Sequence, residues 1–171
     1  MHTSSSFALL DGWAMDIDAL EERDRDRCIC PVCGTQLVAR TTFVHRRGVK
    51  CNADARLPMM ARQLMYERAE ACIAMERPLP LYIDQRSFID SLSCTDAVEG
   101  HSEVQFGEER QTLEFLRPDG RIGLQLHFFS RFPTDEIRYQ KPKGCQLRCI
   151  RVLDNQTLHD IWSDRPVRID C

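Results

Sequence analysis

The chain has 171 residues, which is enough for one ordinary domain or for one domain with a small additional unit. Hydrophobic residues make up 43% of the chain and charged residues 29%, which excludes a disordered or fibrous protein. The net charge of -3 excludes a chain that is basic throughout, so any contact with nucleic acid must come from a local basic patch.

The first 27 residues predict a short hairpin and carry no targeting signal. Asp11-Gly12 stands between the apolar runs Phe7–Leu10 and Trp13–Ile17, and this dipeptide in that position is typical of a two-residue turn. The segment lacks a basic start followed by an apolar stretch and a cleavage site. No apolar run in the chain approaches the roughly 18 residues of a membrane span. We therefore expect a cytoplasmic protein with no membrane partner.

Cysteines cluster in the next segment, CICPVCGTQLVARTTFVHRRGVKC (28–51). The chain has nine cysteines in total, and an odd number without a signal peptide argues against a disulfide framework. Cys30-Pro-Val-Cys33-Gly has the C-x2-C-G form of a zinc knuckle, in which Gly34 permits the positive φ that closes the turn. A tetrahedral zinc ion needs two further ligands, and His45 and Cys51 follow downstream.

We therefore predict a structural Zn²⁺ site made of Cys30, Cys33, His45 and Cys51. Cys28 competes with Cys51 for the fourth position, and free thiols are the alternative to a metal site. No further residue in the segment resembles a base for a zinc-bound water, so a structural role is expected rather than a catalytic one.

Basic residues lie between His45 and Cys51. Arg46, Arg47 and Lys50 are candidates for contacts with the phosphates of nucleic acid. The alternative is an ordinary solvated surface, and the acidic residues of EERDRDR (21–27) weaken the local positive field.

The rest of the chain predicts a helix followed by strands. Apolar residues recur near a 3.6-residue period over 54–77, which predicts an amphipathic helix. Strand patterns follow in LYI (81–83), EVQF (103–106), RQTLEFL (110–116), RIGLQLHFF (121–129) and CQLRCIRVL (145–153). The turn RPDG (117–120) should join the third and fourth of these as a hairpin. Short helices are expected at 134–140 and 156–162.

The residues 7–48 resemble the N-terminal zinc ribbon of competence protein CoiA-like proteins. In that family a short hairpin precedes CPxCGxxLvxr, and an HFxH-like element closes the metal site. Cys30-Pro-x-Cys33-Gly and Phe43-x-His45 match these elements, whereas Thr42 stands where the family has its first histidine. The stretch 120–153 is similar to the family's iaIEiQ.S region.

The resemblance implies a fold and a division of the chain. It implies an α+β protein in which a small zinc ribbon with an N-terminal hairpin (1–53) is joined by a helix to a mixed-sheet, restriction-endonuclease-like domain (54–171). That domain would be of the PD-(D/E)xK type, in which acids on neighbouring strands hold Mg²⁺ and a lysine positions the attacking water.

The same resemblance marks three candidate catalytic residues. Counting outward from the turn RPDG places Glu114, Gln125 and His127 on one face of the hairpin, where the family type has its acids and lysine. Gln125 replaces an acid and His127 replaces the lysine. The alternative is that the three form a polar face of an ordinary amphipathic hairpin.

Two functions from different classes follow. The first is a zinc-ribbon, nuclease-like protein that binds nucleic acid and cleaves DNA with a divalent metal. The second is a catalytically inactive nuclease-like fold that serves as a protein-interaction or regulatory module of a phage or mobile element.

Overall fold

The structure is a computed structural model, and it describes residues 4–83, 93–130 and 143–169. Within these described ranges, two helices are longer than a single turn: α1 (Arg56–Ala74) and α2 (Asn155–Trp162). The strands are β1 (Phe7–Leu10), β2 (Trp13–Asp16), β3 (Leu37–Ala39), β4 (Phe43–His45), β5 (Pro80–Ile83), β6 (Ser93–Asp96), β7 (Glu103–Phe106), β8 (Thr112–Leu116), β9 (Ile122–Phe129), β10 (Gln146–Arg151) and β11 (Val167–Ile169). The helix expected at 134–140 lies outside the described residues.

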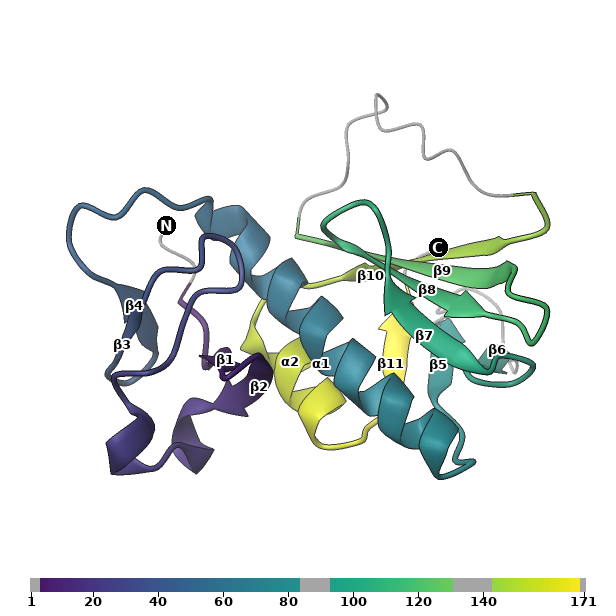
Figure 1. The fold of residues 1–171 in the computed structure, drawn as a ribbon, viewed down its shortest axis with the longest axis horizontal. Helices are drawn as coiled ribbons and strands as arrows, with labels where there is room; N and C mark the ends of the chain where they lie inside the picture. The colour runs from purple at the N-terminus through teal and green to yellow at the C-terminus, as the bar shows by residue number, and fades with distance from the viewer. Residues whose placement is uncertain (1–3, 84–92, 131–142, 170–171) are drawn as a thin grey trace.

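Helix α1 crosses the middle of the molecule, between the small strands β1–β4 and the sheet formed by β7–β10 (Figure 1). This sheet has the order β10-β9-β8-β7, with β8 antiparallel to both of its neighbours, β7 and β9, and β10 parallel to β9. A second sheet has the order β11-β5-β6, with β11 parallel and β6 antiparallel to β5. The fold is therefore α+β, as expected, and contains several small sheets, while the restriction-endonuclease-like assignment stays a prediction.

The two hairpins predicted from turn residues are confirmed. Asp11 and Gly12 both have positive φ, 52° and 88°, which matches the right-handed twist of the two strands that they join. Gly120 closes the turn between β8 and β9 by donating from its backbone N–H to the carbonyl of Arg117 at 2.8 Å. In both hairpins, local turn chemistry sets the strand register.

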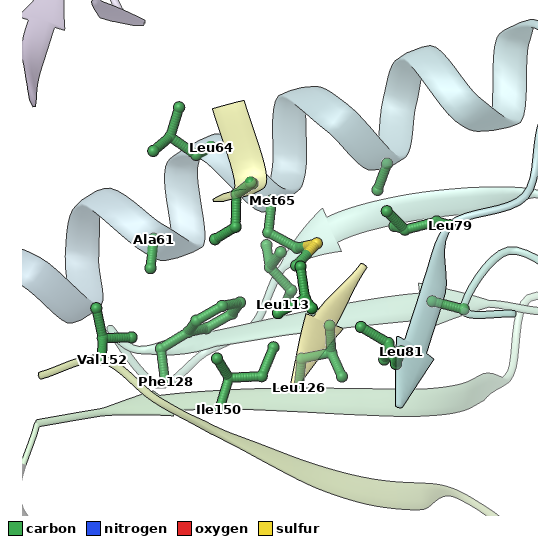
Figure 2. Packing of buried hydrophobic residues seen from close by; sticks show 14 of the residues in the cluster. Ala61, Leu64, Met65, Leu79, Leu81, Leu113, Leu126, Phe128, Ile150 and Val152 are labelled. Carbon is green, nitrogen blue, oxygen red and sulfur yellow. The ribbon is translucent and has the colours of Figure 1, made fainter. Parts of the chain in front are cut away.

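The larger hydrophobic core lies between α1 and the sheet of β7–β10. Side chains alternate along the strands, so Leu113, Leu126 and Phe128 all point toward the helix and are completely buried. Figure 2 shows them beneath Ala61 and Met65 of α1. The helix predicted at 54–77 is thus present and buries one long face on the sheet.

A smaller core lies among β1, β3, β4 and the knuckle. It consists of Ala8, Cys28, Cys30, Leu37 and Phe43, with partly buried side chains around them. This core is the apolar floor beneath the candidate metal ligands.

The N-terminal hairpin belongs to both cores. Ala8 packs in the smaller core, whereas Phe7 and Ala14 on the same hairpin pack in the larger one. The backbone N–H of Ala14 also donates to Oε1 of Glu67 on α1 at 2.7 Å. The expected division into 1–53 and 54–171 stays a prediction, and the hairpin ties the two parts tightly together.

Candidate metal centre

The knuckle is a tight turn held by its own backbone. The N–H of Gly34 donates to the carbonyl of Cys30 at 2.9 Å, and the N–H of Cys30 donates to the carbonyl of Thr35 at 2.9 Å. Gly34 has a φ of 70°, the left-handed conformation that the C-x2-C-G pattern predicts. The turn therefore directs both cysteines, Cys30 and Cys33, toward one point.

Two further ligands reach that point from other elements. His45 ends β4, and Cys51 lies in the loop before α1. The ligand atoms of Cys30, Cys33, His45 and Cys51 all lie within 4.8 Å of one another. The structure thus brings the four predicted ligands together, and this group can hold a metal ion.

The distances in this group fit a tetrahedral ion. With Zn–S bonds of about 2.3 Å, two sulfur ligands in a regular tetrahedron lie about 3.8 Å apart. The Sγ atoms of Cys30 and Cys51 are 3.8 Å apart, and Sγ of Cys33 lies 3.3 Å from Nε2 of His45. A Cys₃His donor set is among those that zinc adopts in structural sites.

The thiols of the group have different proton affinities. Burial raises the pKa of Cys33, but hydrogen bonds with the hydroxyl and backbone of Thr35, and then with His45 and Cys51, outweigh burial and lower that pKa to about 6. Burial and the hydrogen bond with Cys33 raise the pKa of Cys51 to about 12. Cys33 is thus a ready thiolate for a metal, whereas Cys51 needs the metal's own charge to lose its proton.

Cys28 does not take part in this group. It is completely buried in the smaller core, and its Sγ donates to the backbone carbonyl of Asp24 at 3.7 Å. Burial raises the pKa of the Cys28 thiol, which favours the neutral form. Of the two candidates for the fourth ligand position, the structure places Cys51 beside the other three and Cys28 in the apolar floor.

The predicted basic residues lie in the loop between two of the ligands. Arg46, Arg47 and Lys50 are all exposed, and in the described part of the chain none of them forms an ion pair. Arg46 and Arg47 line a cavity that also touches His45 and Cys51, whereas Lys50 does not line it. A metal bound by His45 and Cys51 would fix both ends of this loop.

The second predicted site lies on the face of the β7–β10 sheet that points away from α1. Glu114 on β8 pairs directly with Gln125 on β9, and His127 is two residues further along β9. Strand pairing therefore confirms that the three residues share a face, while their catalytic role stays a prediction. His127 is buried, and burial lowers its pKa to about 4, so its imidazole is neutral at pH 7.

Glu114 is engaged by neighbouring amides. Its Oε2 accepts a hydrogen bond from Nε2 of Gln105 at 2.9 Å, and its Oε1 accepts one from Nε2 of Gln125 at 3.3 Å. Gln105, on β7, did not figure among the residues predicted from sequence. The alternating pattern of EVQF could have placed it on this face, because a residue on a neighbouring strand pairs with Glu114.

A second residue that sequence reasoning missed is Arg56, the first residue of α1. It is only 4% exposed, and its Nη2 donates to the carbonyl of Phe43 at 3.1 Å. An arginine in an amphipathic helix is normally solvated, so the sequence carries no signal for this burial.

Within the described residues, no helix combines the length and apolar character that crossing a bilayer requires. No protein-family model, curated protein or solved structure matches the chain.

Proposed function

We propose that this chain is a zinc-stabilised protein that binds nucleic acid through the basic loop held between two of its zinc ligands. The observation that carries the proposal is the convergence of four ligand atoms, from Cys30, Cys33, His45 and Cys51, to within 4.8 Å of one another. Three thiolates and an imidazole at these distances favour zinc over harder cations such as Mg²⁺ or Ca²⁺, which prefer oxygen.

The role proposed for the zinc is structural. Four protein ligands complete a tetrahedral coordination sphere, so no position remains for a reactive water. The core beneath the ligands is small, and elements of this size commonly depend on metal binding for most of their folding free energy. Zinc would therefore hold the knuckle, β4 and the loop 46–50 in one arrangement.

The loop supplies the proposed contact with nucleic acid. Its three basic side chains are exposed and, in the described ranges, carry no carboxylate partner. Unpaired Arg and Lys side chains on an ordered loop contact phosphates without selecting a base sequence. The acidic run 21–27 carries its own arginines as partners, because Arg23, Arg25 and Arg27 form ion pairs with neighbouring carboxylates.

Metal analysis together with nucleic-acid binding tests this proposal. We expect one zinc per purified chain, and binding to single- or double-stranded DNA that weakens as salt rises. The double variant Arg46→Gln with Arg47→Gln should lose about two phosphate contacts. The plot of log K against log salt concentration should become less steep by the corresponding amount. The control is Arg40→Gln with Arg110→Gln, two exposed arginines with the same total charge change. Equal affinities of the two double variants would contradict the role of the loop.

A second candidate function is metal-dependent cleavage of DNA at Glu114, Gln125 and His127. Glu114 and Gln125 lie opposite each other on neighbouring strands, which is the observation that favours it. The order of ribbon, long helix and mixed sheet also agrees with the resemblance to CoiA-like proteins, which we retain as a proposal. Because two amides already bind the Glu114 carboxylate, binding without cleavage is the function we favour.

A cleavage assay separates these functions. Wild-type protein is incubated with Mg²⁺ or Mn²⁺ and with single- and double-stranded DNA, beside Glu114→Ala. Cleavage by wild type that Glu114→Ala abolishes would establish the nuclease. DNA binding without cleavage would support the zinc-stabilised binding protein. If the wild type neither binds nor cleaves DNA, the protein-interaction or regulatory module would be favoured.

A further inference from the structure

A cavity of about 460 Å³ opens beside the metal centre, between the end of β4, the loop 46–51 and the start of α1. It shares His45 and Cys51 with the metal centre but touches neither Cys30 nor Cys33. Its volume lies within the range of small-ligand sites. Three arginines, Arg46, Arg47 and Arg56, line the cavity, and no acidic side chain of the described residues does.

Arg56 is the unusual member of this lining. Its side chain is buried and its Nη2 donates to the carbonyl of Phe43, while its Nε has no hydrogen-bond partner among the described residues. In the part of the chain that the structure describes, Arg56 forms no ion pair. A buried guanidinium without a counter-charge is costly unless an anion accompanies it.

The start of α1 adds positive potential at the same place. Ala53, which begins the 3-10 turn leading into α1, lines the cavity with Arg56. Neither Asn52 nor Ala55 caps these helices with its side chain, and the first turn of α1 contains no acidic residue. The positive end of this 19-residue helix therefore lies at the cavity, while Asp54, in the 3-10 turn just before the helix, does not line the cavity.

We propose that this cavity binds a phosphate group, with Arg56 on its buried wall and Arg46 and Arg47 at its exposed rim. Zinc with three thiolate ligands leaves one net negative charge at the neighbouring centre, and three guanidinium groups exceed it. A guanidinium presents paired N–H donors that match the oxygens of phosphate. This inference rests on the proposed function to the extent that zinc orders the loop 46–51.

The burial of Arg56 indicates which phosphate the cavity takes. Phosphodiesters along a nucleic-acid backbone reach exposed side chains such as Arg46 and Arg47. A phosphate that contacts Arg56 must enter the cavity, which a phosphomonoester at the end of a strand can do. The same chemistry is offered by free phosphate, so the experiment must separate the two sources.

The test uses the zinc-loaded full chain in phosphate-free buffer. Affinity is measured for inorganic phosphate and for one single-stranded oligonucleotide carrying a 5′-phosphate, a 3′-phosphate or hydroxyls at both ends. We expect a terminal phosphate to tighten binding by about tenfold or more, as a charge-assisted contact does. Inorganic phosphate should compete with that oligonucleotide.

Matched variants locate the effect. Arg47→Gln at the rim and Arg56→Met on the wall should remove the preference for the phosphorylated strand, whereas Arg40→Gln, an exposed arginine outside the cavity, should keep it. If circular dichroism shows that Arg56→Met does not fold, the result for Arg47→Gln decides the question.

Each outcome has one meaning. Equal affinities for phosphorylated and unphosphorylated strands, with inorganic phosphate not binding, overturn the phosphate site while leaving zinc and nucleic-acid binding intact. Inorganic phosphate that binds and depends on Arg56, without any preference among strands, supports the site and assigns the free ion as its ligand. A wild-type protein that contains no zinc when purified and binds none of the oligonucleotides would instead refute the proposed function.

Discussion

The Sγ atoms of Cys30 and Cys51 lie 3.8 Å apart although the two residues are 21 positions apart in the chain. Cys30 is held by the knuckle turn, and Cys51 stands in the loop that follows β4. The contact therefore closes a loop that contains β3, β4 and the basic residues. A metal ion between these sulfurs would hold the loop in its folded form.

Exchange of Cys51 for serine is expected to remove the metal and unfold this part of the chain. Zinc binding contributes on the order of 10 kcal/mol to the folding free energy of small zinc elements. Cys51→Ser should therefore lose its zinc, and the NMR signals of the first 50 or so residues should shift to the positions of an unfolded chain. Zinc content and NMR spectra of the variant measure this. Cys28→Ala is the control, because Cys28 packs in the same small core without joining the ligand group, and it should keep one zinc per chain. A zinc-free Cys28→Ala beside a zinc-loaded Cys51→Ser would reverse the assignment.

Removal of Phe128 is expected to destabilise the larger core. This side chain is completely buried between α1 and the sheet, so Phe128→Ala should lower the free energy of unfolding by about 3–5 kcal/mol through lost burial and a residual cavity. Urea denaturation measures the change. Met75→Ala, at a side chain that is 56% exposed, should change stability by less than about 0.5 kcal/mol. Similar losses in both variants would mean that α1 does not pack on the sheet as described.

Glu114 is expected to contribute to stability whether or not it has a catalytic role. Glu114→Ala leaves the amides of Gln105 and Gln125 without their acceptor, which should cost about 1–3 kcal/mol. Thermal unfolding of this variant beside Glu109→Ala, an exposed carboxylate on the preceding turn, measures the difference. An unchanged melting temperature for Glu114→Ala would contradict the hydrogen-bonded cluster.

His127 is expected to make stability depend on pH. Its pKa is lowered by burial from 6.5 to about 4, so the folded state binds a proton less readily than the unfolded state. The contribution of neutral His127 is fully present above pH 6.5 and is lost as the pH falls from about 6.5 toward about 4. Between pH 7.5 and pH 5 the loss should be about 2 kcal/mol.

His127→Gln isolates that contribution from the others. Protonation of zinc-bound thiols also weakens the protein in acid, but this effect is common to wild type and variant. We therefore expect the stability of the wild type to fall more steeply with pH than that of His127→Gln, in urea denaturation at both pH values. Parallel pH profiles would show that His127 is solvated or charged in the folded state.

Local sequence determined the elements that depend on neighbouring residues. Asp11-Gly12 and the turn 117–120 set two hairpins, because the turn geometry fixes which residues pair. The apolar period over 54–77 predicted α1, and 156–162 predicted α2, each to within a few residues of its ends. The knuckle was also predictable from sequence, because the spacing of Cys30 and Cys33 with Gly34 specifies one tight turn.

The tertiary structure alone decided which distant groups meet. Sequence favoured Cys51 as the fourth ligand but left Cys28 as a competitor, and the packing of the small core places only Cys51 with the other ligands. On α2, the ring centroid of His159 lies 5.0 Å from that of Phe7, and its Nδ1 lies 3.5 Å from Oδ2 of Asp16, so residues from opposite ends of the chain meet. The pattern of α1 predicts a surface position for Arg56, yet Arg56 is buried and donates to the carbonyl of Phe43 on β4. Short-range backbone chemistry sets turns and helices, whereas burial and proximity between distant residues exist only once the whole chain has packed.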